Sequence, residues 1–223
     1  MLEAIAQDLW IAARKLRFLG VETGTRMTLA RLADGGLFVH SPIPLAGGLG
    51  AAVAALGPVK AVVAPSLFHH LSIGEWLQAH PEAAFYACPG LEKKRSDLAW
   101  RGVLGDEAER EWAGEIDQVF FGARSLENEV LFCHRASRTL ICADAIFNLA
   151  RHPSRWTRFV AFAMGNREPG ATFLERLLIR DRAAAREQLD RMLAWEFDRI
   201  VLSHGDLIES GGHEVLRRAY AWL

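Results

Sequence analysis

Apolar residues gather in short runs over the first 64 positions, and turn-forming residues separate the runs. The runs are too short for helices and contain β-branched or aromatic residues, so they indicate strands. The strands predicted in this way are Leu9–Ala12, Arg26–Arg31, Leu37–His40 and Val59–Ala64. Asp34-Gly35-Gly36 predicts a hairpin turn, because aspartate and glycine tolerate positive φ. The small, apolar stretch Ala46–Leu56 predicts a helix before the last of these strands.

Beyond residue 64 the pattern changes to strands that alternate with helices. Ser72 and Glu75 have the spacing of a capping box, which predicts a helix that ends at His80. Segment 91–115 is charged and predicts helix or loop, and segment 145–170, interrupted by proline and glycine, predicts irregular structure. The remaining predictions are strands at Ala84–Cys88, Gln118–Phe121, Glu129–Cys133, Thr139–Ala143 and Arg199–Ser203, with a hairpin between the third and fourth, and helices at Ala171–Phe197 and Glu214–Leu223.

A meander of strands followed by alternating strands and helices predicts an α/β fold in which packed sheets are flanked by helices. The 223 residues and 51% hydrophobic content suffice for one domain with a substantial core, which we expect to span residues 1–223. The sequence has neither GxGxxG nor GxxxxGK[ST], so no glycine-rich phosphate loop follows a strand. The Rossmann and P-loop folds are therefore disfavoured.

With 26 basic and 27 acidic residues the chain has a formal net charge of −1, which is not the pattern of a general nucleic-acid binder. The three cysteines, Cys88, Cys133 and Cys142, form no CxxC motif, and we expect buried thiols in a reducing compartment. The first residues lack the basic region of a signal peptide, and no apolar run approaches the roughly 20 residues that cross a bilayer. We expect a cytoplasmic protein with no nucleic-acid or membrane partner, and a homo-oligomer stays open.

Polar side chains follow three of the predicted strands, where α/β folds place ligands. They are His69 and His70, then Asp144, then His204 with Asp206 close behind. Taken singly, a loop histidine is more often a surface residue than a ligand, and an aspartate after a strand is more often a turn residue. Together, three imidazoles and one carboxylate are the ligand set of a catalytic zinc or non-haem iron site.

The order of these clusters, after a strand meander, resembles the metallo-β-lactamase superfamily and, within it, the uncharacterised DUF4336 family. The matching stretches are Ala64–Trp76, His134–Asp144 and His204–Asp206. The resemblance implies a four-layer αββα sandwich that covers nearly the whole chain.

The superfamily hallmark, HxHxDH, falls on Pro65–His70. The resemblance implies that the first metal site is lost, because Pro65 and Leu67 replace its two histidines and no histidine lies near 122–129. It also implies a second site with His69, His70, Asp144 and His204 as metal ligands, of which His70, Asp144 and His204 would be catalytic. We expect one divalent ion, with zinc first and iron or manganese as alternatives; no metal at all is the other alternative.

Two functions stay open at this point. The first is a mononuclear metal-dependent hydrolase of a small-molecule ester, lactone, thioester or phosphoester, in which the metal lowers the pKa of bound water toward ~7. The second is a non-catalytic binding or assembly protein of the same fold without metal, which Pro65 and Leu67 favour. A redox or oxygen-sensing iron site is a third alternative.

Further residues are candidates for supporting roles. His40, at the end of a strand, is expected to hydrogen-bond to His69 or His70, or to be a structural histidine, and Asp206 to orient its loop. The basic and aromatic segment 151–159, with Arg155 and Trp156, lies in a region, 145–198, where the superfamily often inserts substrate-binding elements. It predicts either a lid for an anionic substrate or a contact with a partner subunit.

Overall fold

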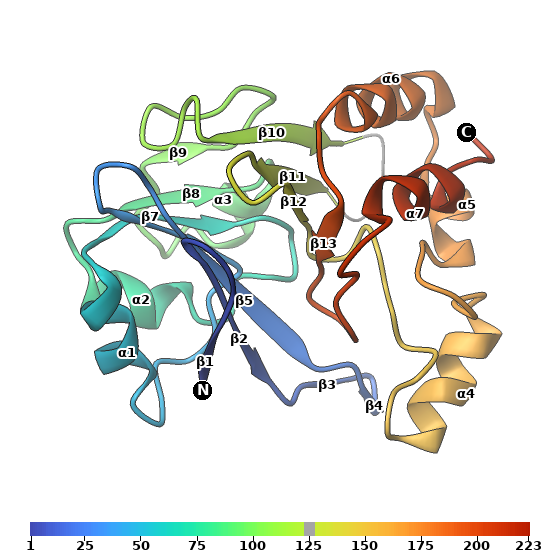
Figure 1. The fold of residues 1–223 in the computed structure, drawn as a ribbon, viewed down its shortest axis with the longest axis horizontal. Coiled ribbons are helices and arrows are strands. Elements are labelled where there is room, and N and C mark those ends of the chain that lie inside the picture. The colour runs from blue at the N-terminus through green and yellow to red at the C-terminus, as the bar shows by residue number, and fades with distance from the viewer. Residues whose placement is uncertain (123–127) are drawn as a thin grey trace.

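The computed structural model describes residues 1–122 and 128–223, which form two sheets between two sets of helices (Figure 1). Sheet one has its strands in the order β1-β2-β5-β6-β7-β8-β9; the first four pair antiparallel, and β6 to β9 pair parallel. These strands are β1 (Leu2–Ala6), β2 (Leu9–Arg14), β5 (Thr25–Arg31), β6 (Leu37–His40), β7 (Val59–Ala64), β8 (Ala84–Ala87) and β9 (Gly102–Val103).

Sheet two has the order β10-β11-β12-β13, with antiparallel pairs up to β12 and a parallel β12–β13 pair. Its strands are β10 (Ile116–Phe121), β11 (Glu129–His134), β12 (Thr139–Ile141) and β13 (Arg199–Val201). A separate hairpin of β3 (Arg17–Phe18) and β4 (Val21–Glu22) extends away from the sheets (Figure 1).

Strand β11 shows why the sheets stack. All its residues are buried, and because successive side chains of a strand point to opposite faces, they enter two different cores. Val130 and Phe132 pack into the core between the sheets, where Phe132 meets Phe38 of sheet one. Leu131 and Cys133 enter a second core on the outer face of sheet two.

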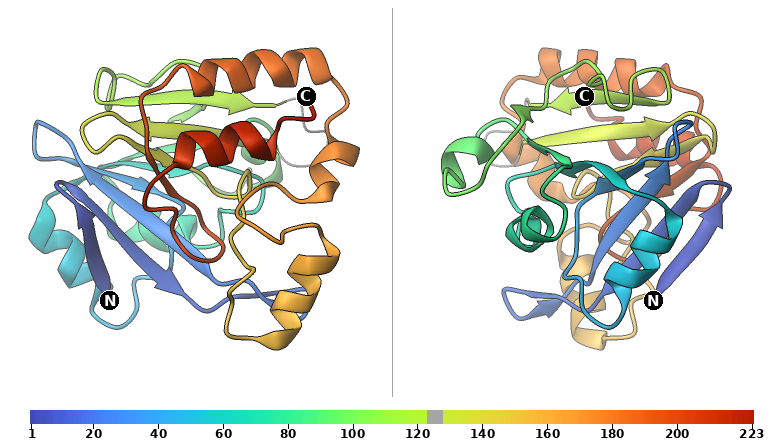
Figure 2. Two further views of the ribbon diagram at one scale, coloured as in Figure 1. Left: turned by 45° about the vertical axis from the view of Figure 1, so that its right-hand side comes forward. Right: turned by 90° about the vertical axis from the view of Figure 1, so that its left-hand side faces the viewer.

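Helices close both outer faces, as Figure 2 shows. Beside sheet one lie α1 (Leu49–Leu56), α2 (Ile73–Ala79) and α3 (Leu91–Lys94), and beside sheet two lie α6 (Arg182–Leu193) and α7 (Gly212–Ala219). Trp76 of α2 is buried in the hydrophobic cluster that includes the strands of sheet one, and Leu189 of α6 and Leu216 of α7 pack into the second core, on the outer face of sheet two. The expected αββα sandwich is therefore confirmed. Helices α4 (Arg155–Ala163) and α5 (Phe173–Leu178) lie at the side.

The predicted strands of both sheets are present, but the reason given for the start of α2 is wrong. Ser72 makes no cap hydrogen bond with its side chain, and Glu75 instead accepts a hydrogen bond from the Leu45 N–H at 3.1 Å. Strand β1, of five residues, and the two-residue strands β3, β4 and β9 were not predicted; a strand of two residues carries almost no pattern.

Segment 145–170 is not irregular throughout, because it contains helix α4. Ser154 caps this helix by accepting a hydrogen bond from the Thr157 N–H at 3.2 Å. The expected helix Ala171–Phe197 is two helices, α5 and α6. Asp181 begins α6 by accepting a hydrogen bond from the Ala184 N–H at 3.0 Å.

The three cysteines are buried free thiols, as expected. Burial raises the pKa of Cys88 and of Cys133 to about 12, so these thiols stay protonated at neutral pH. Within the described part of the chain, no helix combines the length and the apolar character needed to span a bilayer.

Candidate metal centre

The turn after β7 carries His69 toward sheet two. Ser66 Oγ accepts hydrogen bonds from the N–H groups of Phe68 and His69, both at 3.3 Å, and donates to Asp144 Oδ2 at 3.2 Å. A serine at this place therefore folds the turn and ties it to the acidic residue. The His69 ring is fixed from its other side, where its Nδ1 lies 2.6 Å from Ser41 Oγ.

Asp144 follows β12 and is held by a second buried carboxylate. Glu129, the first residue of β11, accepts hydrogen bonds from the N–H groups of Ala143 and Asp144, the latter at 2.9 Å. The Glu129 side chain thus fixes the backbone that presents Asp144. A carboxylate in this position satisfies two amides that the end of β12 leaves without a sheet partner.

His204 follows β13 and is held by strand β5. Its Nδ1 lies 2.8 Å from Gly24 O, and Arg26 donates to the carbonyls on either side of it, to Leu202 O and, at 2.7 Å, to Gly205 O. Gly205 has φ +103°, and a Cβ there would come within 1.9 Å of Asn148 O, so only glycine allows this turn.

These three loops converge on one small site. His69, Asp144 and His204 each present a ligand atom, and the three atoms lie within 4.8 Å of one another. Asp144 Oδ1 is 3.4 Å from His69 Nε2 and 3.1 Å from His204 Nε2. A carbonyl oxygen only accepts hydrogen bonds, so the contact with Gly24 places a hydrogen on His204 Nδ1. In a neutral ring the lone pair then lies on Nε2, which faces Asp144, as metal binding requires.

The site strongly favours an ionised Asp144. Burial alone would raise the pKa of this carboxyl, but the charge of His69 and the hydrogen bonds of His204 and His69 outweigh burial and lower the pKa well below its ordinary value. Burial would lower the pKa of His204, but the hydrogen bond and charge of Asp144 raise it instead. Two imidazoles and one carboxylate are a recurrent set for zinc or non-haem iron, so the residues present fit a single divalent cation.

The structure does not bring His70 to the other three residues. Its Nδ1 lies 3.1 Å from Arg95 Nη1, whereas the adjacent His69 turns toward Asp144. Burial, followed by the charges of Lys94 and Arg95, lowers the pKa of His70 to about 4. Of the four expected ligands, the structure thus brings three together, and the metal-binding roles stay predictions.

His40 and Asp206, the two residues expected in supporting roles, have partners outside the three candidate ligands. His40 is buried against Phe132, and its Nε2 has no hydrogen-bond partner among the described residues; its neighbour Ser41 contacts His69 instead. Burial, then the charge of His69, lowers the pKa of His40 to about 3. Asp206 is linked to Asn148 through its backbone, with its N–H donating to Asn148 O at 3.1 Å.

Arg155 and Trp156 begin helix α4 and are both exposed. Trp156 stacks on Phe159 of the same helix, with the ring centroids 5.6 Å apart. Neither side chain makes a hydrogen bond or ring contact with His69, Asp144 or His204 in the part of the chain that is described. The predicted substrate contacts of Arg155 and Trp156 stay predictions.

The residues corresponding to the first metal site have other contacts. Pro65 O accepts a hydrogen bond from the Val130 N–H at 2.8 Å, and Leu67 O accepts one from Lys94 Nζ at 2.6 Å. Of the range 122–129, in which the sequence offers no histidine, residues 123–127 lie outside the described residues.

Four residues that organise the site were not predicted: Ser41, Ser66, Glu129 and Arg26. Glu129 carried a usable signal, since it is the one charged residue of the apolar run Glu129–Cys133. Ser41 has the backbone φ of +54°, which is uncommon for a residue with a side chain. Nothing in its local sequence indicates that conformation.

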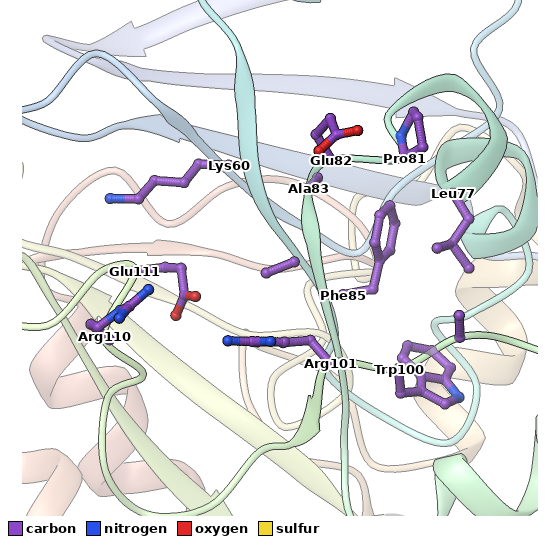
Figure 3. A pocket seen from close by; sticks show the side chains of 12 residues that line it. Lys60, Leu77, Pro81, Glu82, Ala83, Phe85, Trp100, Arg101, Arg110 and Glu111 are labelled. Carbon is purple, nitrogen blue, oxygen red and sulfur yellow. The ribbon is translucent and has the colours of Figure 1, made fainter.

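A surface cavity of about 760 Å³ lies elsewhere, at the amino ends of β7 and β8 (Figure 3). Lys60, Phe85, Trp100, Arg101 and Arg110 are among its lining residues. The candidate ligands follow the opposite, carboxyl ends of their strands, so this cavity is separate from the metal centre.

Comparison with known proteins agrees with the geometry. The model of the family described as "Domain of unknown function (DUF4336)" matches residues 6–176, a span that contains His69 and Asp144. A search of the curated proteins finds no match.

Solved structures with the metallo-β-lactamase fold align with the whole chain. The metallo-β-lactamase from Pontibacter korlensis has 12% identity and a TM-score of 0.68 over 99% of this chain and 97% of that one. FIM-1 from Pseudomonas aeruginosa, in its mono-zinc form, has 11% identity and a TM-score of 0.65 over 100% and 95%. The metal-soaked Flv1 flavodiiron core from Synechocystis has 15% identity and a TM-score of 0.66 over 100% and 60%. At these identities the likeness establishes the fold.

Proposed function

Because this chain belongs to the DUF4336 family and has the metallo-β-lactamase fold, we propose that it is a mononuclear metal-dependent hydrolase whose ligands are His69, Asp144 and His204. The observation that carries the proposal is the shared approach of two Nε2 atoms to one oxygen of Asp144. Both Nδ1 atoms are meanwhile occupied by Ser41 and Gly24. This is the arrangement in which histidine ligands are oriented by their second nitrogen.

A divalent cation bound there would lower the pKa of a water molecule and polarise the oxygen of an ester, lactone, thioester or phosphoester. The residues of the chain have separate tasks. Asp144 and His204 hydrogen-bond to each other, which keeps their own ligand atoms in place, and Ser66 donates a hydrogen bond to the second oxygen of Asp144. His70, with its pKa near 4, is neutral at pH 7; its Nδ1 accepts a hydrogen bond from Arg95, so the ring carries its hydrogen on Nε2, from which it could donate a hydrogen bond to a substrate oxygen. In the net reaction the water oxygen would bond to the carbonyl carbon or the phosphorus, the bond to the leaving alcohol, thiol or phosphate ester oxygen would break, and the leaving group would take up the proton that the water releases.

The rival function is a non-catalytic binding protein of the same fold. It is favoured by Pro65 and Leu67, which stand where the superfamily has the two histidines of its first metal site. In that case the three residues stabilise the fold and have no other task.

Metal analysis distinguishes the two functions. Protein purified without chelator should carry about one equivalent of zinc, iron or manganese if the site is a one-metal centre. The Asp144→Asn variant should lose the metal, while the matched Asp206→Asn variant, whose side chain is not a ligand, should keep it. Equal background metal in all three proteins would exclude the hydrolase.

Activity is then measured on model substrates of each class: a p-nitrophenyl ester, a lactone, an acyl thioester and bis-p-nitrophenyl phosphate. Turnover that needs the metal and disappears in Asp144→Asn supports the proposal. A metal-loaded protein without turnover on any class supports the binding protein.

A further inference from the structure

Two elements protrude next to each other beside the candidate metal centre: the β3–β4 hairpin and helix α4 (Figures 1 and 2). Thr157 Oγ1 of α4 donates a hydrogen bond to Glu22 O of β4 at 3.0 Å. The ring of Phe18 in β3 lies edge-on to Phe68, with the centroids 6.1 Å apart, and Phe68 precedes His69. Both elements are thus connected to the margin of the site.

The apolar side chains of these elements face outward. They are Phe18 (53% exposed), Leu19 (89%), Trp156 (57%), Phe159 (60%) and Phe162 (56%), which we call the aromatic rim. The buried side of α4 consists of the small residues Thr157 and Ala161. Large aromatic residues on the outer side of a helix contribute little to the core, and exposed apolar side chains gathered on two adjoining elements mark a place of interaction.

The charge around the aromatic rim is strongly one-sided. Segments 14–22 and 145–167 contain seven basic residues and one acidic residue, a formal charge of +6. Because the whole chain has a formal charge of −1, all the other residues together have a charge of −7. The basic residues are Arg14, Lys15, Arg17, Arg151, Arg155, Arg158 and Arg167. None of them pairs with a carboxylate in the described part of the chain, and Arg167 instead lies over the ring of Phe162 at 4.3 Å.

This charge determines what can cover the aromatic rim. A second copy of the chain, packed symmetrically, would bring like-charged arginines together, and their repulsion would oppose the contact. An anionic lipid surface has the complementary charge, and protruding Trp, Phe and Leu side chains flanked by arginine are the composition of interfacial anchors. We propose that the aromatic rim docks the protein reversibly onto the surface of an anionic membrane.

This proposal differs from the expectation that the protein has no membrane partner. That expectation rested on the absence of a segment able to cross a bilayer, and binding at the surface needs no such segment. Docking through the aromatic rim would leave Phe68 and His69 near the lipid surface. The proposal does not depend on the metal centre, because its residues are not metal ligands.

Cosedimentation with lipid vesicles tests the charge. The protein should bind vesicles of mixed phosphatidylcholine and phosphatidylglycerol, bind pure phosphatidylcholine vesicles much less, and dissociate as salt is added. Arg151→Gln/Arg155→Gln should weaken binding by about tenfold or more. The matched Arg101→Gln/Arg110→Gln variant removes the same charge from the cavity of Figure 3 and should retain binding.

Apolar contact is tested separately. Phe159→Ser should weaken vesicle binding severalfold, whereas Val103→Ser, which alters an exposed apolar residue of β9, should not. Asp144→Asn should bind vesicles like the unaltered protein, which separates this proposal from that of the hydrolase.

Three results would overturn the proposal. The first is an absence of binding to phosphatidylglycerol vesicles at low salt. The second is an equal loss of binding in the two arginine pairs, which would mean general charge attraction. The third is a dimer in sedimentation velocity that Phe159→Ser dissociates, with no lipid binding, since a second copy would then cover the aromatic rim.

Discussion

The candidate metal centre and the aromatic rim are neighbours, yet the polar groups of the centre and those around the rim are satisfied in opposite ways. In the centre, Asp144 has contacts with His69, His204 and Ser66, so its partners all lie within the chain. Around the aromatic rim, the seven basic side chains form no ion pair with a carboxylate among the described residues. Buried polar groups must find partners when the chain folds, whereas exposed charges are solvated and free to meet a ligand. Substitutions in the centre should therefore lower the stability of the protein strongly, whereas substitutions in the aromatic rim should change its stability little.

The largest loss of stability is expected for a substitution in the buried candidate metal centre. Asp144→Ala leaves two buried imidazoles without their carboxylate and should lower the free energy of unfolding by about 3 kcal/mol. Urea unfolding of metal-free protein measures this loss. As a control, Asp190→Ala removes an exposed ion pair with Arg186 and should cost under about 0.5 kcal/mol. Similar losses in both variants would contradict the distinction.

A smaller loss of stability is expected for Arg26, which contacts the loop that carries His204 but is not one of the candidate ligands. Arg26→Met removes two hydrogen bonds to the loop that carries His204 and should lower the free energy of unfolding by about 2 kcal/mol. Metal affinity, measured by competition with a chelating dye, should fall about tenfold because the imidazole is less well oriented. Arg31→Met, on the same strand, removes a half-exposed pair with Asp8 and should leave metal affinity unchanged.

The lowered pKa of a buried histidine predicts how the stability of the protein changes in acid. Burial lowers the pKa of His134, although Glu115 and Asp8 oppose the shift, so the native protein takes up a proton at lower pH than the unfolded chain. Stability is then complete above about pH 6.5 and falls below it by at most about 1.4 kcal/mol per pH unit for this residue. His134→Gln should make the fall shallower in unfolding curves between neutral and acidic pH. An unchanged slope would show that His134 does not contribute.

The smallest effect belongs to the aromatic rim. Phe159→Ser should change the free energy of unfolding by less than about 0.5 kcal/mol, since the side chain is mostly exposed. Thermal unfolding in the absence of lipid measures it. A large destabilisation would mean that Phe159 packs within the molecule, and the comparison would fail.

The fold was largely predictable from the sequence. Strands such as Val59–Ala64 are apolar runs bounded by turn residues, and each candidate ligand lies in the segment that follows such a run. Helix α4 escaped prediction for a physical reason: its buried side is Thr157 and Ala161, so the apolar spacing of the segment does not mark the side that packs.

The donor set was only partly predictable. His69 and His70 are adjacent and chemically identical, and local sequence does not reveal which one faces Asp144. Ser41, 28 residues earlier, and Arg95, 25 residues later, contact one ring each. Arg26 could not be identified at all, because its acceptors lie 176 and 179 residues away in sequence. Long-range hydrogen bonds of this kind appear only in the folded molecule.

Strand β4 ends at Glu22, and Gly24, two residues later, supplies the carbonyl that holds the ring of His204. A displacement of the hairpin should therefore also move Gly24 O, so this part of the backbone joins the exposed hairpin to the candidate metal centre.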